Sequence, residues 1–261
     1  MPKKRIDLLL VERGLAESRA LAQRLVMAGQ VRVNGEVVLK PADMVRGDAK
    51  VDIDGGARFV SRGGEKLAGA LETLPIQVAG KVCADVGAST GGFTDCLLQN
   101  GAAKVYAIDV GHGILHWKLR NDPRVVVMER TNARNVESLP EPVRLVTVDA
   151  SFISLKILLP VNKKWGSGGV GELEVIALIK PQFEAGRKEA ARGEGVIRDP
   201  EVHRAVLEDV LAFAQAEGYG VRAVIRSPLE GPKGNVEFLA WLAFPGERQN
   251  NLKAMVHQVV G

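Results

Sequence analysis

The sequence predicts an α/β fold with a mostly parallel seven-stranded sheet, preceded by a smaller α+β domain. Over most of the chain, short apolar runs alternate with segments of helical periodicity, which is typical of a doubly wound sheet. The runs fall near residues 81–86, 104–109, 124–128, 144–149, 173–180, 221–226 and 236–243. A tight turn from Gly231 to Asn235 separates the last two runs, so we expect an antiparallel last strand.

Length and composition are those of an ordinary globular protein. The 261 residues, 46% hydrophobic and 25% charged, suffice for one large domain and one small one. A glycine-rich stretch predicts a first domain over 1–54, a linker over 55–60 and a second domain over 61–261. Because no apolar run approaches the ~18 residues of a membrane helix, and no signal-peptide pattern is present, we expect a cytoplasmic protein without a membrane partner. The two cysteines, Cys83 and Cys96, show no metal-ligand spacing, so no metal is expected.

Positive charge is concentrated at the start of the chain. Residues 1–50 hold ten Lys or Arg against six Asp or Glu, whereas the other 211 residues hold 25 of each. This asymmetry predicts that the N-terminal part binds a polyanion.

The same N-terminal part predicts two helices and a small hairpin. Apolar residues at helical spacing indicate a helix over 5–13, and Ser18 can cap a second helix that Gly29 ends. Asn34-Gly35 stands between two valine-rich runs and is a strong hairpin signal. A further short strand is expected at 51–53.

Two basic helices followed by a hairpin, over residues 5–53, resemble the S4 RNA-binding domain. The resemblance implies contacts with folded RNA, because arginine binds phosphate in a bidentate manner and packed helices supply shape. The residues that we expect to make these contacts are Arg5, Arg13, Arg19, Arg24 and Arg32. The alternative is that Arg19, Arg24 and Arg32 form a solvated face.

The stretch 81–95 predicts a ligand site at the end of a buried strand. A β-branched run over 81–86 precedes a glycine-rich turn, and a helix is expected over 94–99. Glycines at such a turn let the backbone approach a ligand closely, as in the nucleotide sites of open sheets. The glycines at 87, 91 and 92 match neither the dinucleotide pattern nor a P-loop.

Asp109 ends the next apolar run about 20 residues beyond the turn, where an acid can accept ribose hydroxyls. This spacing resembles the S-adenosylmethionine site of class I methyltransferases. The resemblance implies a cofactor site built from Asp85, Gly87, Ser89, Gly91, Gly92, Phe93 and Asp109, with Asn132 as a weaker candidate. The alternatives are that Asp85 and Asp109 cap strand ends and that Asn132 is a plain turn residue.

Residues 87–91 also match the G-x-S-x-G pattern of serine hydrolases. A hydrolase would need an acid and then a histidine at strand ends, and the later histidines His203 and His257 both fall in stretches predicted to be helical. The pattern therefore favours a hydrolase only weakly.

Polar residues at the ends of apolar runs are the candidates for chemistry, because ligands bind at the carboxyl ends of parallel strands. Asp149 ends one run, and Lys180 ends the next, where Pro181 should hold it extended. Glu237 begins the last strand, which starts at the same edge if it runs antiparallel. Lys66 lies on the helix before the first strand of the sheet and is free to face that edge.

The set Lys66, Asp149, Lys180 and Glu237 resembles the Lys-Asp-Lys-Glu tetrad of the FtsJ-type RNA ribose 2′-O-methyltransferases. With the S4-like domain in front, nearly the whole chain is similar to the TlyA, or haemolysin-A-type, family. The resemblance implies 2′-O-methylation of cytidines in 16S and 23S rRNA, with ribosomal RNA or subunits as partners. The haemolysin label has no physical support, since no membrane-spanning or strongly amphipathic segment is found.

The expected chemistry is proton removal from a ribose hydroxyl, a poor nucleophile at neutral pH. Lys180 is the candidate for this help, and like-charge repulsion from Lys66 should favour its neutral form. Asp149 and Glu237 should orient the lysines. The alternatives are that Lys180 only steers the hydroxyl, that the four residues are ordinary ion pairs, or that the protein is a non-catalytic RNA-binding factor. Residues 184–195 are expected to form either a lid or a solvated loop.

Overall fold

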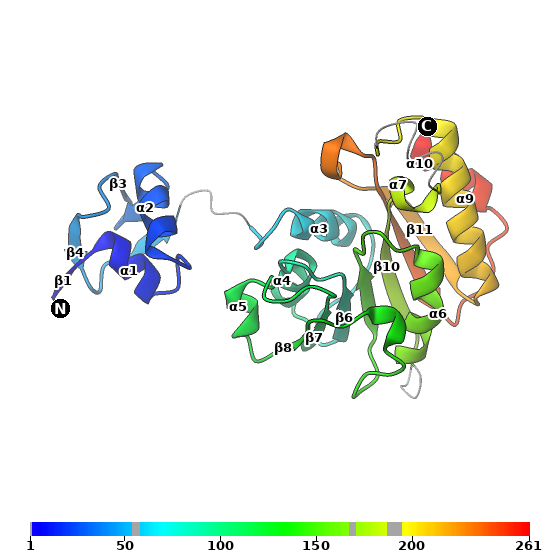
Figure 1. Ribbon diagram of the computed structural model, residues 1–261, viewed down its shortest axis with the longest axis horizontal. Coiled ribbons are helices and arrows are strands. Elements are labelled where there is room, and N and C mark those ends of the chain that lie inside the picture. The colour runs from blue at the N-terminus through cyan, green and yellow to red at the C-terminus, as the bar shows by residue number, and fades with distance from the viewer. Residues whose placement is uncertain (1, 54–57, 167–170, 187–194) are drawn as a thin grey trace. The chain divides into compact units, whose positions relative to one another are not determined.

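The computed structural model describes residues 2–53, 58–166, 171–186 and 195–261, and these form two compact units, Met1–Arg58 and Phe59–Gly261 (Figure 1). The predicted linker, 55–60, extends too far at its C-terminal end. Phe59 is 2% exposed and packs so closely on Gly64 that a Cβ there would lie 2.3 Å from the Phe59 ring. Residues 59 and 60 therefore belong to the second unit, while 54–57 lie outside the described residues.

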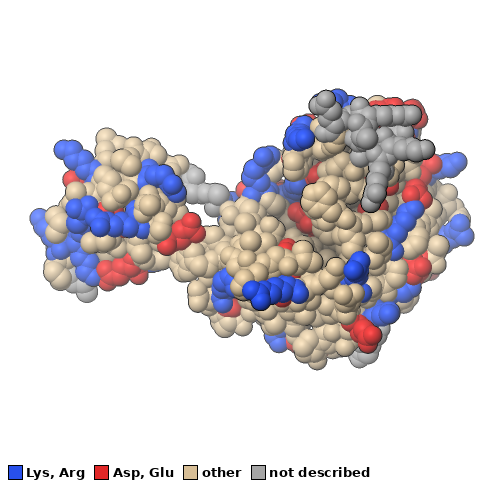
Figure 2. All heavy atoms as spheres, in the orientation of Figure 1, with Lys and Arg blue, Asp and Glu red and all other residues tan. Residues whose placement is uncertain are grey.

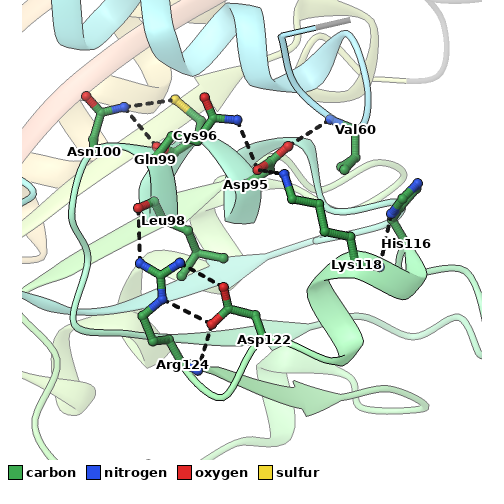
Figure 3. Close-up of polar contacts among 10 residues, drawn as sticks. All are labelled: Val60, Asp95, Cys96, Leu98, Gln99, Asn100, His116, Lys118, Asp122 and Arg124. Atoms are coloured by element: carbon green, nitrogen blue, oxygen red, sulfur yellow. Dashed lines mark hydrogen bonds and ion pairs between the residues drawn. The ribbon is translucent and has the colours of Figure 1, made fainter. Parts of the chain in front are cut away.

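Asp95 lies on the helix α4 (Gly92–Gln99) and holds the first residues of the second unit against this helix (Figure 3). Its buried carboxylate accepts a hydrogen bond from the backbone N–H of Val60 (2.9 Å) and others from Gln99 (3.1 Å) and Lys118 (3.5 Å). A buried carboxylate is stable in the folded chain when such donors replace water.

The first unit has the predicted two helices and hairpin. Ser18 caps the second helix as expected, since its Oγ accepts from the N–H of Leu21. Asn34 and Gly35 both have positive φ, 53° and 90°, which is the backbone that the hairpin signal requires. The helices are α1 (Ile6–Glu12) and α2 (Arg19–Met27), and the strands are β1 (Lys3–Arg5), β2 (Val31–Val33), β3 (Glu36–Val38), β4 (Met44–Arg46) and β5 (Val51–Ile53).

The second unit is built on a seven-stranded sheet with the order β11-β12-β10-β9-β6-β7-β8. Its strands are β6 (Val82–Val86), β7 (Lys104–Ile108), β8 (Val125–Met128), β9 (Leu145–Val148), β10 (Leu173–Ile179), β11 (Gly220–Arg226) and β12 (Phe238–Phe244). β12 runs antiparallel to β10 and β11, and the five strands from β10 to β8 are parallel. The predicted fold is confirmed, because continuous apolar runs are the mark of strands that are buried on both faces.

Helices cover both faces of this sheet, with α3 and α4 on one side and α6 and α9 on the other (Figure 1). Successive residues of β6 enter different cores, since Cys83 joins one apolar cluster and Ala84 the other. Among the described residues, no helix is long and apolar enough to cross a membrane. The helices are α3 (Gly63–Thr73), α4 (Gly92–Gln99), α5 (Trp117–Arg120), α6 (Leu155–Trp165), α7 (Pro181–Glu184), α9 (Pro200–Ala216) and α10 (Leu252–Val260), with short 3₁₀ turns η1 (Ala133–Asn135) and η2 (Pro232–Gly234).

The strand order creates a ligand-binding crevice at the ends of β6 and β9. The chain moves outward from β6 to β7 and β8, then returns to place β9 on the other side of β6. The N–H of Asp149 bonds the carbonyl of Val86 at 2.9 Å, and a Cβ at Gly87 would lie 2.7 Å from the carbonyl oxygen of Asp149. Glycine is thus required at 87 by its positive φ (81°) and by this close approach.

We predict that Gly87→Ala destabilises the second unit much more than Gly80→Ala. Gly80 has a similar φ (76°) with nothing within 4 Å of an added Cβ, so its substitution carries only the left-handed strain, about 1 kcal/mol. At Gly87 the clash with the Asp149 carbonyl should add about 1–3 kcal/mol. Urea unfolding of the two variants measures the difference, and equal losses would contradict the close-approach constraint.

Candidate active site

Two cavities meet at the carboxyl ends of β6 and β9. The larger cavity has a volume of about 900 Å³ and the smaller about 620 Å³. Residues that line both are Gly87, Ser89, Asp149, Ser151 and Phe152. A group bound in one cavity is therefore adjacent to a group bound in the other.

The four predicted tetrad residues all line the larger cavity and form two ion pairs. Lys66 Nζ lies 2.6 Å from Glu237 Oε2, and Lys180 Nζ lies 2.6 Å from Asp149 Oδ1. Both lysines are buried, with 9% and 7% of their surface exposed, and Glu237 is 1% exposed. Pairing is what allows charged groups to remain buried.

Strand register explains why Lys180 and Glu237 lie together. Ile179 pairs with Phe238 at the end of the antiparallel β10–β12 ladder, so the next residues on each strand, Lys180 and Glu237, face each other across the sheet edge. Lys180 is extended (φ −111°, ψ 100°), as the sequence predicts, and Pro181 begins the short helix α7.

Further contacts fix both pairs. Lys180 Nζ also donates to Ser151 Oγ at 3.0 Å, and Gln182 Nε2 donates to Glu237 Oε1 at 3.2 Å. A Cβ at Gly231 would lie only 2.1 Å from Glu237 Oε1, so the 231–234 turn lies directly on this carboxylate. The charge of Lys66 is compensated by Glu237, which weakens the repulsion of Lys180 expected from the sequence.

The smaller cavity contains Asp109 and Asn132. Asp109 accepts the N–H of Ser89 on one oxygen (2.8 Å) and the N–H of Gly111 on the other (2.7 Å), which holds the glycine turn and leaves lone pairs toward the cavity. Asn132 Oδ1 accepts from the N–H of Arg134 and caps η1. Asn132 is therefore a turn residue that also lines the cavity.

The glycine turn contributes to both cavities, with one correction. Gly92 and Phe93 line the larger cavity. Gly91 lines neither, because its φ of 97° turns the chain into α4 and a Cβ there would lie 2.2 Å from Leu119 Cδ1. Gly91 is thus needed for packing rather than for contact with a ligand.

Asp85 is a second correction. It is completely buried, lines neither cavity, and accepts hydrogen bonds from the hydroxyls of Thr94 (2.6 Å) and Thr147 (3.1 Å). Burial is the main cause that raises the pKa of Asp85 to about 7, against the effect of the two hydroxyls. Asp85 therefore joins β6 to α4 and β9 from within the core, rather than binding a cofactor.

Phe152 and Ser151 are site residues that the sequence did not suggest. Phe152 is 91% exposed, has a positive φ of 63°, and lines both cavities. Its ring lies 4.8 Å from the ring of Phe183. A phenylalanine so exposed is unusual, but no sequence pattern distinguishes it from a buried one.

The two histidines considered for a serine hydrolase, His203 and His257, lie outside the cavities that contain Ser89. His203 is buried on α9, where its ring nitrogen contacts the carbonyl of Ile197, and His257 lies on α10. Neither lines a cavity. Of the other two histidines, His112 pairs with Glu129 (3.2 Å) and the N–H of His116 bonds the carbonyl of Thr90 (3.1 Å), but neither lines the cavities that contain Ser89.

In the first unit, Asp7 organises two of the predicted arginines. Asp7 is fully buried, accepts two hydrogen bonds from Arg5 (3.0 and 2.9 Å), and accepts one from Arg19 (3.0 Å). The Arg5 guanidinium is the main cause that holds the pKa of Asp7 well below its usual range. Arg5 and Arg19 remain partly exposed beside each other.

The other predicted arginines differ in their surroundings. Arg13 donates to the carbonyls of Gly47 (2.7 Å) and Ala49 (2.6 Å), and Arg32 donates to the carbonyl of Gly35 (3.1 Å). Arg24 is exposed on α2. Figure 2 shows Lys and Arg side chains over much of the visible face of this unit.

Comparison with known proteins decides the family. Residues 59–244 match the FtsJ-like methyltransferase model, and residues 4–51 match the S4 domain. The chain belongs to the FtsJ-like methyltransferase family. Its cofactor is accordingly S-adenosylmethionine, and the predicted resemblance is confirmed.

Relatives of this FtsJ-like methyltransferase match over nearly its full length. A Mycobacterium tuberculosis protein named 16S/23S rRNA (cytidine-2′-O)-methyltransferase TlyA is 45% identical over 265 residues, 99% of this chain and 97% of that protein. A Brachyspira hyodysenteriae protein named hemolysin A is 43% identical over 242 residues, 90% of this chain and 98% of that protein. A solved Streptococcus thermophilus structure matches with a TM-score of 0.71 and 43% identity, covering 99% of this chain and 96% of that one.

The smaller cavity fits the cofactor of an FtsJ-like methyltransferase. Asp109 presents a carboxylate suited to ribose hydroxyls, and Ile114 and Ile157 supply apolar walls for an adenine ring. Gly87 has no side chain where the cofactor would pass toward the larger cavity.

We predict that Asp85→Asn removes a pH dependence of stability. The folded-state pKa of Asp85 is raised, so its contribution is fully present below about pH 4 and is lost as pH rises toward about 7. Relative to the variant, the wild type should lose up to about 4 kcal/mol of unfolding free energy between pH 4 and 8, at about 1.4 kcal/mol per pKa unit. Urea unfolding across this range checks it, and a pH-independent difference would contradict it.

Proposed function

We propose that this chain is an S-adenosylmethionine-dependent ribosomal RNA methyltransferase that modifies the ribose 2′-hydroxyl of cytidine in 16S or 23S rRNA. The observation that carries the proposal is the convergence of Lys66, Asp149, Lys180 and Glu237 in a cavity that adjoins the cofactor-sized one. The printed name of the Mycobacterium tuberculosis relative supports the choice of nucleoside and acceptor atom.

Each cavity has a separate task in this proposal. The bound cofactor supplies a methyl group on a positively charged sulfur, which is already activated for transfer. Asp109 and Asn132 hold the cofactor's nucleoside part in the smaller cavity. Asp149 lies at the border of the cavities, where its negative charge favours the sulfonium and its oxygen holds Lys180.

Lys180 is the residue that assists the acceptor hydroxyl. The Lys180 ammonium first gives one proton to water, and the resulting amine takes the proton of the 2′-hydroxyl while the ribose is held in line with the methyl group. The Lys66–Glu237 pair forms the facing wall of the larger cavity and positions the ribose by hydrogen bonding. Residues 187–194 of the predicted lid lie outside the described residues.

RNA is held at two places. Phe152 offers an exposed ring at the border of the cavities, on which the target base can stack. In the first unit, Arg5, Arg19 and Arg24 offer guanidinium groups to phosphates. Folded rRNA within a ribosomal subunit suits this combination better than a short single strand, since shape and phosphate contacts carry the binding.

We predict that Lys180→Ala lowers methyl transfer by about 10²-fold or more, the range for loss of a positioned acid or base. The assay uses labelled methyl donor with unmodified 30S and 50S subunits and with naked rRNA. Lys164→Ala is the matched control, because Lys164 is exposed on α6 and lines neither cavity.

The outcomes of this assay separate the alternatives. RNA binding without transfer to any acceptor would favour a non-catalytic RNA-binding factor. Undiminished transfer by Lys180→Ala would remove Lys180 from the mechanism. Mapping the labelled ribose then identifies the nucleotide and the subunit.

We predict that Arg24→Gln and Arg13→Gln change different properties, the first RNA binding and the second stability. Arg24→Gln should weaken rRNA binding and reduce the slope of log affinity against log salt by about 1, with unchanged stability. Arg13→Gln removes hydrogen bonds to two backbone carbonyls, so it should cost about 1–2 kcal/mol of stability in the first unit. Binding titrations at several salt concentrations and thermal unfolding are measured for both variants. A loss of stability in Arg24→Gln, with weaker RNA binding but unchanged stability in Arg13→Gln, would contradict the assignment.

A further inference from the structure

Ser151 lies where the two cavities meet, and its hydroxyl accepts a hydrogen bond from Lys180. Ser151 Oγ lies 3.0 Å from Lys180 Nζ, while Asp149 Oδ1 lies 2.6 Å from the same nitrogen. Ser151 is itself exposed and lines both cavities, whereas Lys180 is 7% exposed.

We propose that Ser151 is a positioning residue that directs the lone pair of Lys180 at the acceptor hydroxyl; this inference rests on the proposed function. A neutral lysine amine is tetrahedral, with the bond to Cε, two N–H bonds and one lone pair. Asp149 and Ser151 each accept one N–H. The lone pair therefore occupies the single remaining direction, which faces the larger cavity that Lys180 lines.

The proton balance of the step follows from this geometry. The 2′-hydroxyl gains the methyl group and gives its proton to the lone pair of Lys180 Nζ, and the cofactor leaves as the neutral thioether. The resulting ammonium then passes one proton to Ser151 Oγ, whose own hydroxyl proton goes to water. Since a hydroxyl accepts and donates at the same time, Ser151 ends unchanged and one proton is released.

The backbone around Ser151 is held in place by an independent contact. Glu184, four residues beyond Lys180, accepts the hydroxyl of Ser154 (2.6 Å) and the N–H of Leu155 (2.8 Å). This carboxylate joins the loop after β9 to the segment after β10. These hydrogen bonds therefore restrain the loop that carries Ser151 relative to the segment that carries Lys180.

The residue after Ser151 carries backbone strain. Phe152 has a φ of 63°, in the left-handed region that costs a non-glycine residue about 1 kcal/mol or more. Strain of this kind persists where surrounding contacts determine the conformation. Here the Ser151 hydroxyl contacts Lys180 and the Phe152 ring is exposed.

The test compares Ser151→Ala with Ser151→Thr in methyl transfer to the ribosomal subunit that the wild type modifies. Ser151→Ala should lower the transfer rate at saturating substrates by about tenfold at every pH from 7 to 9, with unchanged cofactor affinity and thermal stability. Ser151→Thr keeps the hydroxyl and should stay within about threefold of the wild type. Ser138→Ala, at an exposed serine that lines neither cavity, is the control.

A double-mutant cycle with Lys180→Ala separates positioning from a general structural effect. If Ser151 acts through Lys180, Ser151→Ala should cost nothing further in the Lys180→Ala background. An equal loss in both backgrounds, a wild-type rate for Ser151→Ala, a failure of threonine to rescue, or a loss confined to cofactor affinity would each overturn the inference.

The same assay distinguishes failure of the inference from failure of the proposed function. A wild type that transfers no methyl group to any RNA, or an undiminished Lys180→Ala, would remove both proposals. An active wild type and an impaired Lys180→Ala, with Ser151→Ala at the wild-type rate, would remove the role of Ser151 alone.

Discussion

Two lysine–carboxylate pairs are the interaction on which the active site depends. Each buried ammonium has a carboxylate 2.6 Å away; Glu237 is itself buried, whereas Asp149 is partly exposed. Removal of one partner from a fully buried pair costs about 3–5 kcal/mol. The four side chains come from α3 and from the ends of β9, β10 and β12. Their pairing therefore requires an antiparallel β12, since only a strand of that direction begins at the edge where its parallel neighbours end.

A second constraint joins the tetrad to the cofactor. Gly87 approaches the carbonyl of Asp149 so closely that no side chain fits between the ends of β6 and β9. Asp149 is thus held by its backbone beside the cofactor turn and by its side chain beside Lys180. The two cavities share a border of five residues, Asp149 among them, so groups bound in the two cavities would be adjacent without any movement of the sheet.

Much of the fold and of the tetrad could be predicted from the sequence. The seven strands lie within two residues of their predicted ends, because runs buried on both faces are continuous and end in glycine or polar residues. The strand-end rule likewise found Asp149, Lys180 and Glu237. Asp85 was assigned wrongly because sequence does not show whether an acid at a strand end faces a cavity or the core. Phe152 was missed because no sequence pattern distinguishes an exposed phenylalanine from a buried one. The strands β1 and β4 were missed because three residues are too few to show alternation.

Asp7 shows a different limit, because its second partner, Arg19, is 12 residues away in sequence and the burial of Asp7 follows from packing. A guanidinium carries five N–H donors, and Asp7 engages two on Arg5 and one on Arg19. The two arginines and their shared carboxylate have a combined charge of only +1, yet their remaining donors are held at fixed positions on the surface. Such an arrangement contributes less to non-specific attraction than two free arginines would, and more to recognition of one phosphate geometry. The fixed donors of Arg5 and Arg19 therefore favour an anion of matching geometry over polyanions in general.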